Sequence, residues 1–132
     1  MTTEQDEPRT VISSYRDLVV WRASVELAVD CYSVTKAFPP SELCGMTSQI
    51  RRSSTSISAN IAEGHGRENT GSFVQFLRIA QGSLKELETH MIVSERVGLI
   101  TKDGSIRLLA QTDEIGKMLR SMIRKLQQKL ER

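Results

Sequence analysis

The sequence predicts an all-α protein that folds as an antiparallel, up-down-up-down four-helix bundle. Along four segments, apolar residues recur at spacings of three and four, which is typical of helices buried on one side. The connections between these segments, at 39–40, 64–69 and 99–104, are short, so each helix is expected to run antiparallel to its predecessor. No segment has the period of two that indicates a half-buried strand.

Length and composition are those of one domain. The chain has 132 residues, 39% of them hydrophobic and 26% charged, which suffices for an aliphatic core and differs from a disordered chain. Residues 1–14 mix polar residues with proline and have no period, so we expect a flexible arm there and the bundle over 15–132. No run approaches the roughly 18 apolar residues of a membrane span, and two cysteines are too few for a disulfide scaffold. These features predict a cytoplasmic protein with no membrane partner.

The first helix is expected to begin near Tyr15 and to end at Phe38. Pro39 and Pro40 end it, because proline lacks the backbone N–H donor and disfavours helical geometry in the residue before it. The residues that share its predicted apolar face are Leu18, Trp21, Val25, Ala28, Tyr32 and Thr35.

The second helix is expected over 42–63, with Ser41 as its N-cap and with Gly64 and Gly66 as its C-terminal stop. Its middle, at 53–58, holds five Ser or Thr residues, which have low helix propensity. Packing within the chain or between chains must therefore stabilise this segment. Small side chains permit a neighbouring helix to approach closely, and hydroxyl groups can bond to carbonyls one turn earlier.

The third and fourth helices complete the bundle. The third is expected to be capped by Asn69 or Thr70 and to end at Gly98, and the fourth to be capped by Asp103 or Ser105. The fourth has the most regular pattern, with apolar residues at alternating spacings of four and three, as in a coiled coil. These residues are Leu108, Thr112, Ile115, Leu119, Met122, Leu126 and Leu130.

The residues that could carry chemistry indicate neither an enzyme nor a cofactor or metal site. His65 and His90 lack the Glu-x-x-His partner of a di-iron bundle, and surface histidines are the simpler interpretation. The hydroxyl-rich segment 53–58 has no Gly-x-Ser-x-Gly elbow for a nucleophile. Cys31 and Cys44 lie on expected helices, where buried side chains are a better interpretation than reactive thiols.

The net charge of +2 favours no class of partner, but the basic residues are unevenly distributed. Residues 114–132 contain six Lys or Arg and two Glu. Helical spacing places Lys117, Arg120 and Arg124 on one face, where they would form a basic ridge. An alternative of equal weight is a solvated face whose cations complement the helix dipole at its C-terminus. Other basic positions, partly neutralised by nearby glutamates, are Arg51, Arg52, Arg67, Arg78 and Lys85.

Five short motifs occur in the order and with the loop lengths of one bacterial family. They are DLVVW at 17–21, QIRR at 49–52, SISANIAEG at 56–64, FLRIA at 76–80 and GSLKELET at 82–89. The sequence thereby resembles the four-helix-bundle proteins encoded in 23S rRNA intervening sequences, a family related to the accessory variability determinant proteins of diversity-generating retroelements. The resemblance covers 15–126 and departs at Cys44, where an aromatic residue is common, and at Met46, where leucine is usual.

The resemblance implies a bundle that assembles into a ring-shaped homopentamer, binds RNA or DNA and has no catalytic residues. Ser53, Ser56 and Ser58 are expected at the subunit interface, since small side chains allow close helix contact. Few aromatic residues are present for base stacking, so binding is expected to be electrostatic and weakly selective for sequence. The residues expected to contact phosphate are Arg51, Arg52, Arg67, Arg78, Lys117, Arg120, Arg124 and Lys125.

Two alternatives are also compatible with the sequence. Arg51, Arg52 and Arg78 can instead form ion pairs between subunits, with Glu63 or Glu88 as partners, an interpretation of equal weight. The protein can also be a scaffold whose partner is another protein, for example a reverse transcriptase, as in the retroelement branch of the family. The motifs are equally compatible with that branch and with the rRNA-insertion branch.

Overall fold

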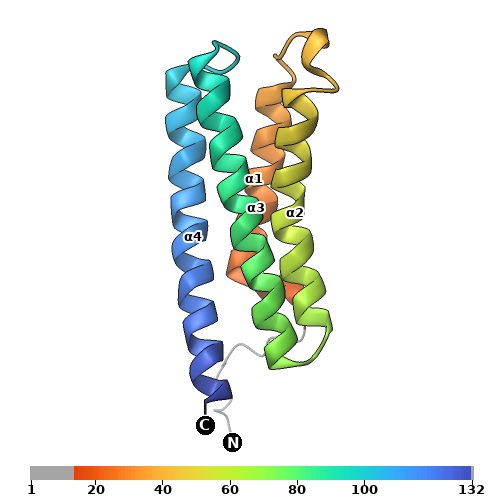
Figure 1. Cartoon of the computed structure of the whole chain (residues 1–132), viewed down its shortest axis with the longest axis vertical. Coiled ribbons are helices and arrows are strands. Elements are labelled where there is room, and N and C mark those ends of the chain that lie inside the picture. The colour runs from red at the N-terminus through yellow and green to blue at the C-terminus, as the bar shows by residue number, and fades with distance from the viewer. Residues whose placement is uncertain (1–13, 132) are drawn as a thin grey trace, which may run out of the picture.

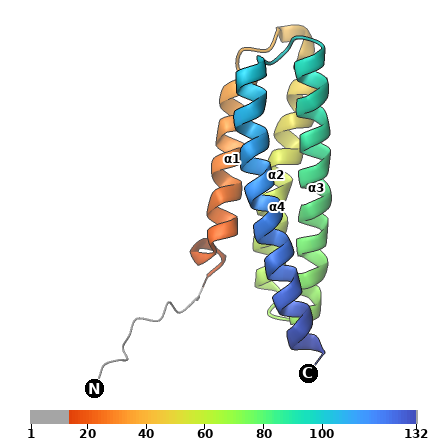
Figure 2. The same cartoon turned by 90° about the vertical axis from the view of Figure 1, so that its left-hand side faces the viewer.

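The structure, a computed structural model that describes residues 14–131, consists of four long helices packed side by side (Figure 1). Consecutive helices run in opposite directions, as predicted, and no strand occurs within the described range (Figures 1 and 2). Residues 1–13 of the expected arm lie outside that range. The elements, with η denoting a 3-10 turn, are η1 (Tyr15–Asp17), α1 (Val19–Thr35), η2 (Pro40–Glu42), α2 (Met46–Gly66), α3 (Thr70–Arg96) and α4 (Lys102–Leu130).

The first helix is shorter at both ends than the sequence predicted. Residues 15–17 form a separate turn, because Ser14 and Asp17 make a capping box in which the Ser14 N–H donates to Asp17 Oδ2 at 3.2 Å. Leu18 is then extended (φ −77°, ψ 126°), and α1 begins after it. At its other end α1 stops at Thr35, because the proline pair that follows requires the chain to leave helical geometry before it.

The second helix begins later than predicted. Ser41 does not cap it, because Pro40 starts the turn η2 and Gly45 has a non-helical backbone (φ −104°, ψ −115°). The side chain of Glu42 caps the helix instead, because its Oε1 accepts a hydrogen bond from the Met46 N–H at 3.0 Å.

Gly64 does not stop α2, which continues through it and ends at Gly66. Gly64 is buried, and a Cβ added there would lie 2.5 Å from the Cβ of Phe76 on α3. Glycine at this position therefore permits the close approach of α2 and α3 and does not terminate the helix. The chain leaves α2 through Glu68, whose φ of 56° lies in the left-handed region.

The ends of α3 agree with the sequence. Asn69 Oδ1 accepts the Ser72 N–H at 2.9 Å and caps the helix. At the other end α3 stops at Arg96, and Gly98, two residues later, has a φ of 86°, a conformation that glycine adopts without strain.

The start of α4 differs from the prediction. Thr101 has an extended backbone, and its Oγ1 accepts the Gly104 N–H at 3.0 Å, so the helix begins directly after Thr101. Asp103 and Ser105 therefore lie within the first turns and cap nothing. The hydroxyl of Ser105 is buried and has no hydrogen-bond partner among the described residues.

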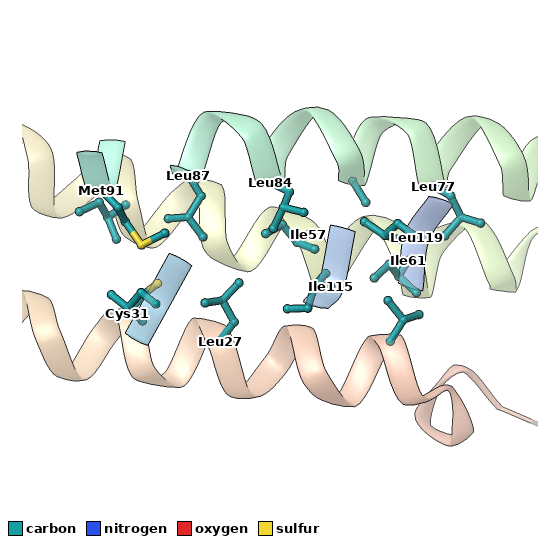
Figure 3. Close-up of a cluster of buried hydrophobic side chains, with 14 of the residues drawn as sticks. Leu27, Cys31, Ile57, Ile61, Leu77, Leu84, Leu87, Met91, Ile115 and Leu119 are labelled. Carbon is teal, nitrogen blue, oxygen red and sulfur yellow. The ribbon is translucent and has the colours of Figure 1, made fainter. Parts of the chain in front are cut away.

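The core is a column of aliphatic side chains along the middle of the bundle (Figure 3). Every helix contributes fully buried residues, such as Leu27, Ile57, Leu84 and Leu119. Small hydroxyl side chains are buried beside them, and most donate to a backbone carbonyl one turn earlier, which removes the cost of burying them. Such donors are Ser24, Ser53, Ser54 and Thr112.

Some residues assigned to apolar faces lie at the surface. These are Tyr32 and Leu130. For Leu130 the reason is length: α4 has 29 residues and α1 has 17, and the last turns of α4 extend beyond the start of α1 (Figure 2). The buried position after Leu119 is Ile123 and not Met122, because a helix with 3.6 residues per turn drifts from a seven-residue repeat.

Candidate nucleic-acid interface

A groove between α3 and α4 gathers three basic side chains. Arg78 and Lys85 lie seven residues apart on one face of α3, and Arg120 lies on α4. Together with Gly82 and Gly116 they line a groove of about 410 Å³. Cations from two helices thus converge on one depression of the surface.

The two glycines keep this groove open. Gly82 is exposed, and a Cβ added there would meet no atom within 4 Å. Gly116 is buried, and a Cβ there would lie 3.5 Å from Leu84 Cδ2 and 3.7 Å from Arg120 Nη1, which are ordinary contact distances. Larger side chains would therefore fit at either position, but they would occupy space that is now open to a ligand.

Most of the positive charge in the groove is not neutralised by the chain itself. Arg78 and Arg120 are exposed, and neither forms an ion pair within residues 14–131. Lys85 Nζ lies 3.1 Å from Glu88 Oε1, but the lysine side chain is 69% exposed, so solvent screens this pair. The groove can therefore attract an anion.

The basic ridge predicted on α4 divides between two sides of the helix. Arg120 lines the groove beside α3, whereas Lys117 and Lys125 line a second groove beside α1. Arg124 lines neither groove. All four side chains are exposed, and in the described part of the chain none of them has an ion-pair partner.

Arg51 makes contacts inside the chain. Its Nε donates to Thr35 Oγ1 at 2.9 Å, and its guanidinium carbon lies 4.6 Å from the centre of the Tyr32 ring. Both partners belong to α1, so Arg51 links α2 to α1 through a hydrogen bond and a cation–π contact.

Arg52 and Arg67 also have partners within the chain. Arg52 Nη2 lies 3.5 Å from Glu86 Oε2 on α3. Arg67 Nη2 donates to Glu63 Oε2 at 3.1 Å, and its guanidinium carbon lies 4.9 Å from the centre of the Phe76 ring. Both arginine side chains are more than half exposed, so these ion pairs are weak and can exchange for a phosphate.

The two glutamates expected to form ion pairs between subunits have basic partners in their own chain. Glu63 pairs with Arg67 and Glu88 with Lys85, both at 3.1 Å. Neither contacts Arg78. Pairing between subunits stays a prediction.

The serines expected at a subunit interface take part in packing within the chain. Ser53 is 1% exposed and donates to the Gln49 carbonyl at 2.8 Å. Ser56 Oγ lies 2.9 Å from Ser83 Oγ, which joins α2 to α3. Ser58 is half-buried. Their place in an oligomer stays a prediction, but Ser53 offers almost no surface for it.

Sequence reasoning missed part of the groove. Lys85 was not among the phosphate contacts, although its spacing of seven from Arg78 is visible in the sequence. The position of Arg120 opposite these residues depends on the register of α4 against α3. Spacing along a single helix contains no information about that register.

The remaining reactive residues form no second site. Cys31 is fully buried, as expected, and burial raises the pKa of its thiol to about 12. Cys44 contradicts the prediction: it is exposed, because it lies in the connection before α2 and not on a helix. His65 contacts the Phe73 ring, and His90 Nε2 lies 3.3 Å from Glu86 Oε2. No group of three or more metal-ligating side chains occurs in residues 14–131.

The fold and the groove together define a class: a four-helix bundle with a basic groove on its surface. The chain belongs to the 23S rRNA-intervening sequence protein family, whose model matches residues 16–121. This confirms the resemblance inferred from the motifs. Between residues 14 and 131, no helix is long and apolar enough to cross a membrane.

A solved structure supports the family assignment. The chain is similar to a crystal structure of a protein of unknown function from the S23 ribosomal protein family of Bacteroides thetaiotaomicron. The two sequences are 32% identical, the match covers 80% of this chain and 98% of that chain, and the TM-score is 0.70. No curated protein matches the sequence significantly.

Proposed function

We propose that this chain is a non-enzymatic accessory protein that binds the phosphate backbone of RNA or DNA. The observation that carries this proposal is the convergence of Arg78, Lys85 and Arg120 on one groove. Arginine and lysine side chains contact phosphate oxygens in most nucleic-acid complexes, and such contacts carry little sequence selectivity. Membership in a family named for 23S rRNA intervening sequences supports this class of ligand.

The exposed cations determine how binding should respond to salt. Five of the predicted phosphate contacts, Arg78, Lys117, Arg120, Arg124 and Lys125, have no ion-pair partner within the described residues. Each phosphate contact contributes about −0.7 for a single strand, or about −0.9 for duplex DNA, to the slope of log affinity against log salt. Five contacts therefore correspond to a slope of about −3.5 to −4.5 per chain.

We further propose that the chain forms the ring-shaped homopentamer that the family resemblance implies. A net charge of +2 per chain becomes about +10 in five copies. Each copy would present the same groove, so one long nucleic acid could contact several subunits. Such multivalent binding is stronger than binding to a single copy.

Binding of labelled structured RNA and duplex DNA at two salt concentrations tests this function, with oligomer mass measured by light scattering. Arg78→Gln/Arg120→Gln removes two cations of the groove. Arg96→Gln/Arg107→Gln is the matched control, because it removes two exposed arginines outside the groove. We expect the groove variant to bind at least about tenfold more weakly with a salt slope smaller by about 2, and the control to change little.

Two outcomes would contradict the proposal. Equal losses in the groove variant and the control would attribute binding to net charge and not to the groove. Absence of binding even at low salt would exclude nucleic acid as the ligand.

The alternative function is a scaffold that binds another protein, such as a reverse transcriptase. Exposed apolar side chains favour it: Ile92, Val93 and Val97, near the end of α3, are 41%, 42% and 65% exposed. Binding at such an apolar surface would change little with added salt, whereas phosphate binding would weaken steeply. The salt dependence therefore separates the two functions.

A further inference from the structure

A pocket of about 340 Å³ lies between α1 and α2, near the end of the bundle where these two helices are connected (Figure 1). Around the bundle the helices follow the order α1, α2, α3, α4, and α1 also packs against α4, so this pocket is on the opposite side from the groove between α3 and α4. Its volume lies within the range of about 300–1,000 Å³ that pockets for small ligands have. Its lining combines arginine and hydroxyl side chains with a tyrosine ring and a leucine, and none of the described residues that line it is acidic.

The guanidinium of Arg51 is held in place in this pocket. Its Nε donates to Thr35 Oγ1 at 2.9 Å, and its guanidinium carbon lies 4.6 Å from the centre of the Tyr32 ring. Thr35 is itself fixed, because it is buried and its hydroxyl donates to the Cys31 carbonyl at 2.8 Å. These contacts leave both Nη groups of Arg51 without a hydrogen-bond or ion-pair partner in the described part of the chain. A guanidinium held in this way can bind a phosphate through two parallel hydrogen bonds and loses little side-chain entropy on binding.

Two further groups can support an anion beside Arg51. Ser48 precedes it by three residues, so both side chains lie on one face of α2. Ser48 is exposed, and its hydroxyl has no hydrogen-bond partner within residues 14–131, so its O–H is free to donate. Arg52 also lines the pocket. Its Nη2 lies 3.5 Å from Glu86 Oε2, but the arginine side chain is 61% exposed, so this ion pair is weak.

The same pocket has an apolar side that a phosphate alone does not require. Tyr32 is 42% exposed, and Leu43, in the connection before α2, is 62% exposed. Unpaired bases stack on aromatic rings and on the planar guanidinium of arginine, and Tyr32 with Arg51 over its ring offers both. A base inside a duplex is covered by its neighbours and cannot enter such a pocket. The groups that line the pocket therefore fit a nucleotide that is not paired.

We propose that the pocket between α1 and α2 binds one unpaired nucleotide of a nucleic-acid strand. The phosphate of this nucleotide accepts hydrogen bonds from Arg51 and Ser48, and its base lies against Tyr32 and Leu43. The inference rests on the proposed function, since it needs a bound strand, and it narrows the ligand to single-stranded or looped nucleic acid. A free mononucleotide has the same phosphate and base, so the experiment distinguishes these two sources.

Removal of the bases from the ligand tests the pocket without changing the protein. Binding to the full chain is measured for a short single-stranded DNA and for a strand of equal length whose sugars carry no bases. Both strands carry the same phosphates, so contacts of the backbone with the groove between α3 and α4 contribute equally to both affinities. We expect the strand with bases to bind at least about tenfold more tightly, because stacking adds to the phosphate contacts.

Substitutions in the pocket then locate the base. Tyr32→Leu removes the ring, and we expect it to reduce the ratio of the two affinities to about twofold or less, whereas Tyr32→Phe keeps both the ring and the ratio. Leu43→Ser should lower the ratio about threefold. Leu130→Ser is its matched control, because it removes a leucine of similar exposure, 54%, outside the pocket. A partly unfolded variant does not disturb the ratio, since the loss of active protein affects both strands equally.

The possible outcomes separate this inference from the proposed function. A ratio near one in the unchanged chain would overturn the inference and leave the proposed function intact. Absence of binding to both strands would contradict the proposed function and this inference with it. A ratio that persists in both Tyr32→Leu and Leu43→Ser would place base recognition elsewhere on the surface and would also overturn the inference. Adenosine monophosphate that binds the unchanged chain but not Tyr32→Leu, together with a ratio near one, would assign the pocket to a free nucleotide and not to a strand.

Discussion

Cys31 lies among the aliphatic side chains at the centre of the bundle (Figure 3). Burial disfavours the charged thiolate and raises the pKa of the thiol from 9.0 to about 12. The folded chain therefore keeps Cys31 protonated, and the residue acts as a small apolar side chain. Cys44 illustrates the opposite case: it is exposed because it lies in the connection between η2 and α2 and not on a packed helix.

The shifted pKa of Cys31 predicts a loss of stability at alkaline pH. The unfolded chain loses the thiol proton near pH 9 and the folded chain only near pH 12, so between these values the folded state binds more protons and its stability falls as pH rises. From pH 8 to pH 10 we expect this group to lower the free energy of unfolding by about 1.4 kcal/mol. Urea denaturation at both pH values measures it. Cys31→Ala should be less stable overall but lack this part of the pH dependence, and an identical dependence in both chains would contradict the pKa shift.

At the scale of elements, helix ends depend on side chains that lie outside the periodic pattern. Three residues near the start of α4 have side chains that commonly cap helices, namely Thr101, Asp103 and Ser105. Only Thr101 has both an extended backbone and a side-chain oxygen that accepts a backbone N–H of the first turn, that of Gly104, at 3.0 Å. Similarly, α2 is capped by Glu42 from the preceding turn, which no pattern within the helix indicates.

The cap of α4 can be tested with two alanine substitutions. Thr101→Ala removes the hydroxyl that accepts the Gly104 N–H, and we expect it to lower the free energy of unfolding by about 1 kcal/mol. Ser105→Ala removes a buried hydroxyl without a partner among the described residues, so we expect no loss or a gain of up to about 1 kcal/mol. Urea denaturation of both variants gives these values. A larger loss for Ser105→Ala than for Thr101→Ala would reverse the assignment of the cap.

At the scale of the whole molecule, the sequence predicts the number, order and direction of the helices, because these follow from local periodicity and short connections. The sequence does not predict which basic side chains of different helices lie close together. The spacing of Arg78 and Lys85 places both on one face of α3, but their proximity to Arg120 depends on how two helices align. The role of Gly64 is hidden for the same reason: a glycine near a helix end suggests a stop, and only the packing of Phe76 against it reveals a close approach.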